Sequence, residues 1–201
     1  QGIFDQLPPA ADSLAFFIGR EIGIQCRKMG VHVNFAPVVD VNSNPLNPVI
    51  GTRAFSADPE RVAHLGSLYM RGLQSQGVMA VAKHFPGHGD TKTDSHLELP
   101  VLNHTHEYMD TIDLLPFRRL IKDGVQGVMT AHLQVNSYDS LHPSSLSPVL
   151  VNDLLRKKMG FNGMVFTDGL DMKGVTNHYS NGKGELQALR AGNDILLLPP
   201  D

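Results

Sequence analysis

The sequence predicts an α/β fold, and within that class a (β/α)8 TIM-type barrel that this chain does not complete. Short apolar segments rich in β-branched residues alternate with amphipathic helical segments, which indicates a parallel sheet covered by helices. Most of the apolar segments end in polar or ionisable residues, as the strands around a barrel active site do. The expected strands are residues 31–40, 78–84, 125–132, 163–168 and 194–199.

Helical segments separate these strands. Residues 12–29 place apolar side chains at helical intervals until a glycine ends the pattern. Two further helices begin with an N-capping Asp or Ser followed by proline and end at a glycine, and they cover residues 58–77 and 147–160. Residues 104–123 also predict a helix, which Pro116 is expected to divide in two. Because no linker or repeat interrupts the alternation, residues 1–201 are predicted to form a single domain.

Four of the five expected strands end in residues that can carry chemistry, namely Asp40, Lys83 with His84, His132 and Asp168. In a (β/α)8 barrel the carboxyl ends of the strands meet at one face, so these side chains are expected to converge. A doubly wound open sheet binds ligands at the same edge. The sequence has neither GxGxxG nor GxxxxGK(S/T) after the first strand, which favours the barrel. Since a complete barrel has eight strands, we expect this chain to be a fragment of a longer protein.

The composition is that of an ordinary globular protein. Of the 201 residues, 41% are hydrophobic and 18% are charged, and the net charge is -3. No apolar run approaches the roughly 20 residues that a membrane-spanning helix needs. Because no basic face is present either, we expect no nucleic-acid partner and no membrane segment in this chain. Cys26 is the only cysteine, which excludes an internal disulfide.

The stretch KHFPGHGDTKTDSH, residues 83–96, holds three histidines, two lysines and two aspartates. One interpretation is a zinc site built from its side chains, and the candidate ligands are His84, His88, Asp94 and His96. The spacing of His84 and His88 suits a helical zinc pair, but Pro86 and the glycines beside it oppose a helix, and no Glu follows His84. A loop that transfers protons and binds sugar, without metal or cofactor, is therefore the favoured interpretation.

The same stretch, extended to KHFPGHGDTKTDSHLELP, resembles the N-terminal catalytic domain of glycoside hydrolase family 3, and specifically its β-N-acetylglucosaminidase branch. The segment GFNGMVFTDGLDMKGV carries the resemblance equally, and NFAPVVDVN, IGTRAFSADPE and AGNDILLLPPD match further blocks in the family's order. The resemblance covers essentially the whole chain. It implies a (β/α)8-type barrel and retaining hydrolysis of terminal, non-reducing β-linked N-acetylglucosamine, with no metal and no cofactor.

The resemblance also implies catalytic roles. Asp168 in FTDGLDM would be the nucleophile that forms a glycosyl-enzyme intermediate, while Asp171 is the rival carboxylate and is interpreted as structural. His96 would be the general acid and base, with Asp94 as its orienting partner. An Asp two residues from a His on an irregular loop can hydrogen-bond the ring and favour its protonated form, so the physical chemistry agrees with this assignment.

Five further residues are candidates for substrate binding. Lys83, His84 and Arg53 resemble the family's ligands to sugar hydroxyls, although a structural ion pair is an equal alternative for Arg53. Asp40 is expected either to bind substrate or only to cap the loop that follows it. His132 is expected either to contact substrate or to brace the barrel mouth.

The expected partner is a carbohydrate, an N-acetylglucosaminide from a cell-wall fragment or a chitooligosaccharide. Other functions remain open, and they are a β-glucosidase or glycoside phosphorylase of the same family and a non-catalytic sugar-binding barrel. Gly169 stands where the family commonly has Asp, which leaves the shape of the nucleophile turn open. The compartment is equally open, between bacterial cytoplasm and the periplasm or exterior.

Overall fold

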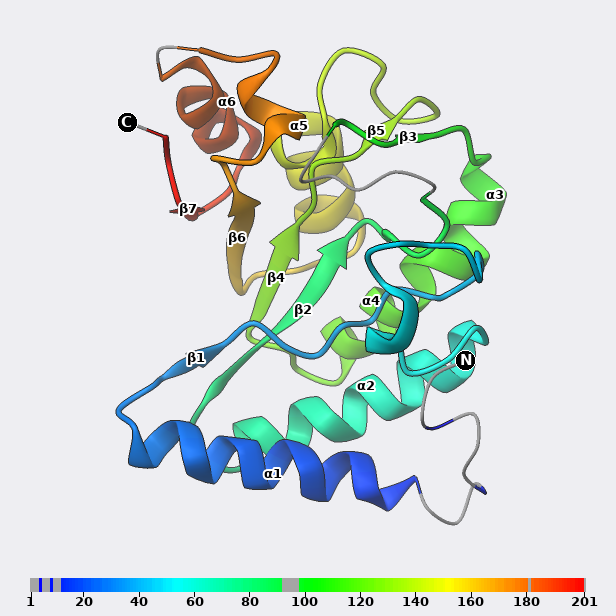
Figure 1. Ribbon diagram of the computed structural model, residues 1–201, viewed down its shortest axis with the longest axis vertical. Coiled ribbons are helices and arrows are strands. Elements are labelled where there is room, and N and C mark those ends of the chain that lie inside the picture. Colours follow the sequence, from blue (N-terminus) through cyan, green and yellow to red (C-terminus); the bar gives the residue numbers. More distant parts are fainter. Residues whose placement is uncertain (1–3, 5–7, 9–11, 92–97, 181, 201) are drawn as a thin grey trace.

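A computed structural model of the protein describes residues 4, 8, 12–91, 98–180 and 182–200. In this part of the chain, five parallel strands form one sheet in the order β1-β2-β4-β6-β7 (Figure 1). They are β1 (Val33–Asn34), β2 (Met79–Phe85), β4 (Gly127–Thr130), β6 (Met164–Gly169) and β7 (Ile195–Leu197). The sheet curls as half of a barrel, so the predicted fold class is confirmed.

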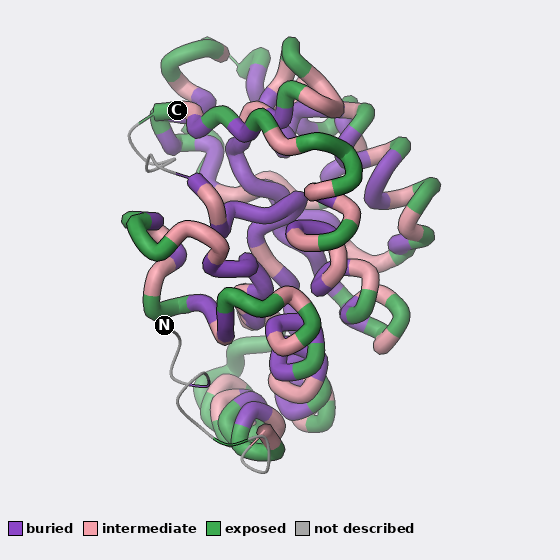
Figure 2. Tube along the Cα trace, turned by 90° about the vertical axis from the view of Figure 1, so that its right-hand side faces the viewer, coloured by how far each residue is buried: buried purple, intermediate pink, exposed green. Residues whose placement is uncertain are grey.

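Helices cover one face of this sheet. They include α1 (Ser13–Lys28), α2 (Pro59–Gln74), α4 (Leu114–Lys122) and the π-type helix η6 (Val149–Lys158). The main hydrophobic core lies between them and the sheet, and its members on α2, β2 and α4 include Leu73, Ala80 and Phe117. Burial concentrates there along the chain trace, while the outer turns of the helices are exposed (Figure 2). None of the described helices has the length and apolarity to cross a membrane.

The opposite face of the sheet has a smaller apolar cluster of its own. Val81, Met129 and Phe166 are buried on it, and the ring of Phe35 packs edge-on against Phe166 with centroids 5.4 Å apart. Strand residues alternate between the two faces, which is why Val81 lies on this face while its neighbours Ala80 and Ala82 join the main core. The arrowheads of β2, β4 and β6 point to one end of the molecule, so the carboxyl ends of these strands lie together (Figure 1).

All five expected strands are present, although the first is shorter than expected. Regular pairing within residues 31–40 is confined to Val33–Asn34, with an isolated bridge from Val38 to Lys83. Pro37 has no N–H to donate, and the Ala36 N–H bonds back to the Asn34 carbonyl oxygen, so the ladder is interrupted between these two pairings. The chain nevertheless stays beside β2 as far as the Lys83 carbonyl oxygen, which accepts the N–H of Val39.

The prediction that Pro116 divides a helix was wrong. The helix continues through α3 (His106–Tyr108), a π-type segment η4 (Met109–Asp113) and α4 (Leu114–Lys122). Pro116 lies in the first turn of α4, directly after the widened π-type turn in which the Leu114 N–H bonds to the Met109 carbonyl oxygen. The proline therefore falls where the hydrogen-bond ladder has already shifted, and no break follows.

Several short elements were not expected from the sequence. A two-stranded parallel sheet joins β3 (Val101–Leu102) to β5 (Gln134–Val135). Two helices, α5 (Lys173–Thr176) and α6 (Lys183–Ala191), fill the connection between β6 and β7. One-turn 3-10 segments η3 (Gly51–Arg53) and η5 (Ser144–Leu146) support loops at the carboxyl end of the sheet.

Candidate active site

A cavity of about 680 Å³ opens at the carboxyl ends of the central strands. Asp168 from the end of β6 and Lys83 from β2 both line it, as the strand-end argument predicted. Part of its wall is apolar and comes from Phe35, Met129 and Met172. A cavity with an apolar wall and a few converging charged groups is the usual form of a small-molecule site.

Asp168 is the penultimate residue of β6 and is half-buried. Its Oδ1 accepts the N–H of Gly169 at 2.9 Å, so the carboxylate is held by its own turn. Asp171 is exposed and lines the same cavity. A Cβ placed on Gly169 would lie 2.7 Å from Oδ1 of Asp171. Glycine at position 169 thus leaves room for the Asp171 carboxylate, which an aspartate there would displace.

Lys83 lies near charged groups from three other segments of the chain, those of Arg53, Asp168 and Asp40. Its side chain is half-buried, and burial together with the Arg53 guanidinium lowers the pKa of the Lys83 ammonium, against the opposing effect of Asp168 and Asp40. Lys83 therefore lies within electrostatic reach of three charged groups that the sequence had singled out. The peptide bond between Lys83 and His84 is cis.

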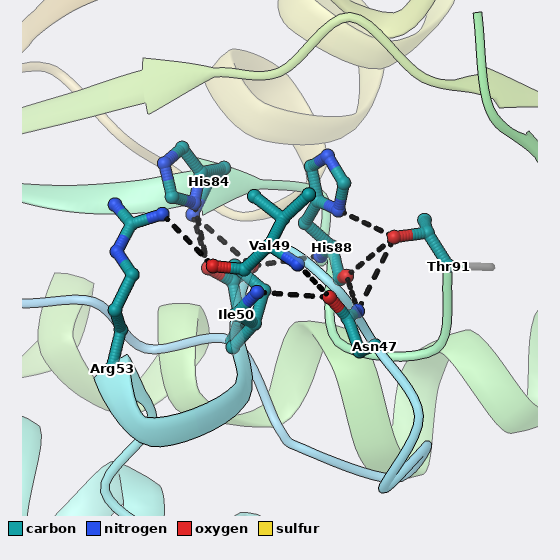
Figure 3. A network of polar contacts seen from close by, with 8 residues as sticks. Asn47, Val49, Ile50, Arg53, His84, His88 and Thr91 are labelled. Carbon is teal, nitrogen blue, oxygen red and sulfur yellow. Dashed lines mark hydrogen bonds and ion pairs between the residues drawn. The ribbon is translucent and has the colours of Figure 1, made fainter. Parts of the chain in front are cut away.

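Arg53 reaches the site from η3, the one-turn segment that follows β1 in the chain. It is exposed, and its Nη1 donates to the Val49 carbonyl oxygen at 3.4 Å (Figure 3). Among the described residues Arg53 takes part in no ion pair. Both expectations for Arg53, a contact to sugar and a structural pairing, stay predictions.

Asp40 anchors the histidine loop and does not cap its own. The carboxylate is fully buried; it accepts the His88 N–H at 2.7 Å, and one of its oxygens lies 2.7 Å from Nδ1 of His84. The His84 N–H approaches both carboxylate oxygens at 3.2 Å. Burial alone would raise the pKa of Asp40, but His84 and His88 outweigh it and hold that pKa below its ordinary value. The carboxylate is therefore kept ionised in the interior by the loop that it holds.

Besides the bond from its N–H to Asp40, His88 is held at its ring and at its carbonyl oxygen. Oγ1 of Thr91 lies 2.7 Å from Nδ1 of His88, and Nδ2 of Asn47 donates to the His88 carbonyl oxygen at 2.7 Å (Figure 3). Burial lowers the pKa of His88, although the Asp40 carboxylate opposes that change. Next to it, Gly89 touches backbone, because any Cβ there would overlap the Val41 carbonyl oxygen. The loop and the end of the first strand segment are thus in direct backbone contact.

His132 supports the turn that follows Asp168. It is fully buried, and its Nδ1 lies 2.6 Å from Oγ of Ser145, while Nε2 lies 2.8 Å from the Gly169 carbonyl oxygen. A carbonyl only accepts, so Nε2 carries the proton and donates to it, and Nδ1 then accepts from the Ser145 hydroxyl. Of the two expected roles, this geometry favours bracing the barrel mouth.

The two remaining sequence candidates, His96 and Asp94, lie outside the described residues. The zinc alternative also includes them, together with His84 and His88, whose ring centroids are 5.9 Å apart. Within the described ranges, no group of three or more His, Cys, Asp or Glu side chains is arranged to hold a metal ion. His84 and His88 each have a polar partner at Nδ1, Asp40 for His84 and Thr91 for His88.

The sequence reasoning missed a second cluster of ionisable groups beside this loop. His104 lies between two carboxylates, those of Asp90 and Asp113. The sequence signal was weak, because Asp113 occurs inside a predicted helix, where an aspartate is ordinarily solvated. A helical Asp that is only 1% exposed requires a buried partner, and only the structure reveals that burial.

The arrangement defines a class of protein first: a parallel β/α half-barrel with charged groups in a cavity at its strand ends, which is the location of barrel enzyme sites. Comparison with known proteins then identifies the family. Residues 10–201 match the glycosyl hydrolase family 3 N terminal domain. The chain therefore belongs to that family, as the sequence motifs predicted.

Individual relatives agree with this assignment. The chain is 39% identical over 204 residues to "Beta-hexosaminidase A" of Pseudoalteromonas piscicida, covering 96% of this chain and 34% of that protein. A glycoside hydrolase family 3 β-N-acetylglucosaminidase from Paenibacillus sp. str. FPU-7 has a TM-score of 0.91 at 44% identity, covering 92% of this chain and 36% of that one. The β-glucoside phosphorylase BglX bound to 2FGlc has a TM-score of 0.91 at 29% identity, covering 94% and 36%. The chain thus spans about a third of the length of each of these proteins.

Proposed function

We propose that the protein containing this chain is a retaining exo-β-N-acetylglucosaminidase, which removes terminal, non-reducing β-linked N-acetylglucosamine from cell-wall fragments or chitooligosaccharides. The observation that carries the proposal is the convergence of Asp168 and Lys83 in one cavity, from the ends of β6 and β2 on either side of β4. The names of the relatives support the substrate, since β-hexosaminidase and β-N-acetylglucosaminidase recur among them.

Asp168 acts as the nucleophile. Its carboxylate oxygen attacks the anomeric carbon and forms a glycosyl ester while the bond from that carbon to the leaving oxygen breaks. The Lys83 ammonium lies within electrostatic reach of the Asp168 carboxylate, which raises the pKa of Lys83 against the larger lowering effect of burial. Water then attacks the same carbon, the ester bond breaks, and Asp168 is regenerated.

His96 moves the proton in both steps, with Asp94 orienting its ring. It donates a proton to the departing oxygen, and the neutral ring later accepts a proton from the attacking water. A histidine suits both duties, because its unperturbed pKa of about 6.5 is close to neutral pH. The usual relation between carboxylate separation and stereochemistry does not apply, since the second group is not a carboxylate.

The sugar hydroxyls are bound by His84, Lys83 and Arg53. Nδ1 of His84 is occupied by Asp40, so the ring presents its opposite nitrogen to a hydroxyl. Arg53 adds a fork of donors from η3. Asp40 contributes indirectly, because its carboxylate is fully buried and fixes His84 and His88.

A phosphorylase of the same family is the second candidate. The likeness to BglX is what favours it, since that structure matches this chain as well in shape as the hydrolase does. In a phosphorylase, phosphate replaces water as the acceptor of the glycosyl group, and no step needs the acid/base histidine to deprotonate water.

The test compares aryl N-acetylglucosaminide with aryl glucoside, each with and without phosphate, using the full-length protein. We expect turnover of the N-acetylglucosaminide, free N-acetylglucosamine as product and no stimulation by phosphate. A sugar phosphate product would establish the phosphorylase instead. Absence of turnover on every substrate would leave the sugar-binding barrel.

Replacing His96 sharpens the same test. General-acid help is worth roughly 100- to 10,000-fold and matters most for basic leaving groups. His96→Ala should therefore nearly abolish cleavage of natural disaccharides. On a nitrophenyl substrate it should show a burst of nitrophenol, with kcat and KM falling together because deglycosylation becomes limiting. Equal slowing of every leaving group without a burst would remove His96 from this role.

A further inference from the structure

His104 joins two acidic residues that belong to different parts of the chain. Its Nε2 lies 2.7 Å from Oδ2 of Asp90, in the loop after β2, and its Nδ1 lies 3.0 Å from Oδ2 of Asp113, at the end of η4. Asp113 is 1% exposed and Asp90 is 35% exposed at the side chain. The imidazole thus bridges a carboxylate in the interior to one at the rim.

The bridge requires a charged imidazole. An ionised carboxylate only accepts hydrogen bonds, so both ring nitrogens must donate, which only the imidazolium can do. The pKa of His104 is raised accordingly, first by the hydrogen bond with Asp113 and also by Asp90, against the opposing effect of burial. Burial raises the pKa of Asp113, and its contact with His104 offsets only part of that rise. The positive ring thus favours the ionised form of Asp113 without fully compensating its burial.

The other groups that face His104 do not replace either carboxylate. The Tyr108 ring lies over the imidazole with centroids 4.1 Å apart, and it comes from α3. Glu98 and Asn103 line the same hollow of about 470 Å³ as His104 and Asp90. Glu98 is exposed, so it adds negative potential around the ring without entering the bridge.

The bridge is also in contact with the histidine loop. Asp113 packs directly on Gly87, since a Cβ at that glycine would lie 2.7 Å from Cβ of Asp113. The loop from Lys83 to Thr91 is held at several points, among them the side chains of Asn44 and Asn47, and two of these points involve buried carboxylates. One is Asp40, which binds His84 and His88; the other is Asp113, which packs on Gly87 and reaches Asp90 near the loop's end through His104.

We propose that His104 is a positioning residue for the reaction: by joining Asp90 to Asp113 it holds the end of the Lys83–Thr91 loop, from which the chain continues to His96. His104 does not contact the sugar. It acts through the loop, and the part of the inference that concerns catalysis rests on the proposed function of His96.

The direction of the pH effect follows from the same geometry. The folded-state pKa of His104 is raised, so the bridge is complete below the ordinary histidine value of about 6.5 and is lost as pH rises through the raised value. Loss of one N–H leaves one carboxylate without its partner. The loop end should then open more often at alkaline pH than at neutral pH.

The test uses His104→Ala and His104→Gln in the full-length protein, with His64→Ala as the matched control. His64 is also paired with an aspartate, Asp12, at 3.5 Å, but it lies on α2, away from the strand ends. On a natural disaccharide we expect His104→Ala to lower kcat about 10- to 100-fold while KM changes by less than about threefold, because a small displacement of the proton donor is costly. On a nitrophenyl substrate the loss in the glycosylation step should be clearly smaller, and added imidazole should restore part of the rate.

Hydrogen exchange provides a readout that does not need activity. Amides of the Lys83–Thr91 loop should exchange faster in both His104 variants and should be unchanged in His64→Ala. In the wild type their exchange, corrected for the intrinsic rate, should rise at alkaline pH. In His104→Gln that rise should disappear, because the amide does not titrate.

The outcomes separate the two ideas. If no N-acetylglucosaminide is cleaved by the wild type, the proposed function fails. The hydrogen-exchange measurement then remains as the test of whether His104 holds the loop. If exchange in the loop is unchanged, or if every leaving group is slowed equally, the inference is overturned while the hydrolase stands. Should His104→Ala fold poorly, Asp90→Asn weakens only the exposed end of the bridge. It should then give a milder form of the same leaving-group pattern, and a normal pattern in that variant would count against the bridge.

Discussion

The loop after β2 and the turn after β6 lie at the same, carboxyl end of the sheet but are held very differently. In the loop, buried Asp40 receives hydrogen bonds from His84 and His88, and Thr91 holds the ring of His88. In the turn, the Asp168 carboxylate accepts, among the described residues, one hydrogen bond, from the adjacent Gly169 N–H. The loop is thus fixed by a buried charge, whereas the turn keeps a half-buried carboxylate at the cavity.

The difference follows from what each carboxylate must do. A buried carboxylate is stable only when its charge is compensated, and Asp40 is bonded by His84 and His88. Under the proposed function Asp168 is the nucleophile, and a nucleophile saturated with donors would lose reactivity, since each hydrogen bond stabilises the ground state that must attack. The fold therefore places the buried partners around Asp40 and Asp113 and leaves Asp168 half-buried.

The largest effect is expected at Asp168. Asp168→Asn keeps the shape of the turn but removes the nucleophile, and kcat should fall by several orders of magnitude. A mechanism-based fluorosugar should form a slowly hydrolysed ester on Asp168, which peptide mass spectrometry would locate. The melting temperature should change little. An ester found on Asp171 would reverse the assignment of the two carboxylates.

The next largest effect is expected on the free energy of unfolding, when Asp40 in the loop region is replaced. Asp40→Asn leaves the partners of a buried carboxylate uncompensated, and breaking such a pair typically costs about 3–5 kcal/mol. Denaturant unfolding should show this loss, while Asp153→Asn, which breaks the exposed pair with Lys157, should cost less than about 1 kcal/mol. Comparable losses in both variants would mean that Asp40 does not anchor the loop.

The same residue makes the stability depend on pH. The folded-state pKa of Asp40 is depressed, so its contribution is fully present above the unfolded-state value of about 4 and is lost as pH falls through the lower folded value. The wild type should therefore lose stability in acid over that range. In Asp40→Asn this part of the acid dependence should be absent.

The smallest effect is expected at Ser145, whose hydroxyl contacts the His132 ring that supports the turn after Asp168. Ser145→Ala removes the partner of Nδ1 in His132 but leaves the bond from Nε2 to the Gly169 carbonyl oxygen. A buried group without its partner costs about 1–3 kcal/mol, and kcat should fall only a few-fold. Ser75→Ala, which removes a hydroxyl that donates to the Gly72 carbonyl oxygen at the C-terminal end of α2, is the control and should leave kcat unchanged.

Much of the fold could be predicted because its signals are local. The alternation of apolar strands and amphipathic helices, with caps at Asp58 and stops at glycine, located the five strands and the main helices. What could not be predicted depends on contacts between distant segments. The pairing of β3 with β5 joins two-residue strands that have no periodicity of their own, and Pro116 is tolerated only because a π-type turn precedes it.

The site shows the same limit. Strand-end position correctly brought Asp168 and Lys83 into one cavity. The partner of Asp40 lies 44 residues away and the bridge at His104 joins three segments, so neither follows from spacing. The roles of His96 and Asp94 remain predictions from the motif that contains them.

The contact between Gly89 and Val41 has a consequence for how this sequence can drift. Any side chain at position 89 would put a carbon atom where the Val41 carbonyl oxygen lies, and backbone cannot be trimmed to make room. At Gly77 a Cβ would meet open space, and only the backbone angle, φ +69°, favours glycine there. Asparagine, which tolerates that backbone region, is therefore acceptable at position 77, whereas any side chain at position 89 forces the Lys83–Thr91 loop away from the end of the first strand segment. Two glycines that look alike in the sequence thus differ in how much substitution each can tolerate.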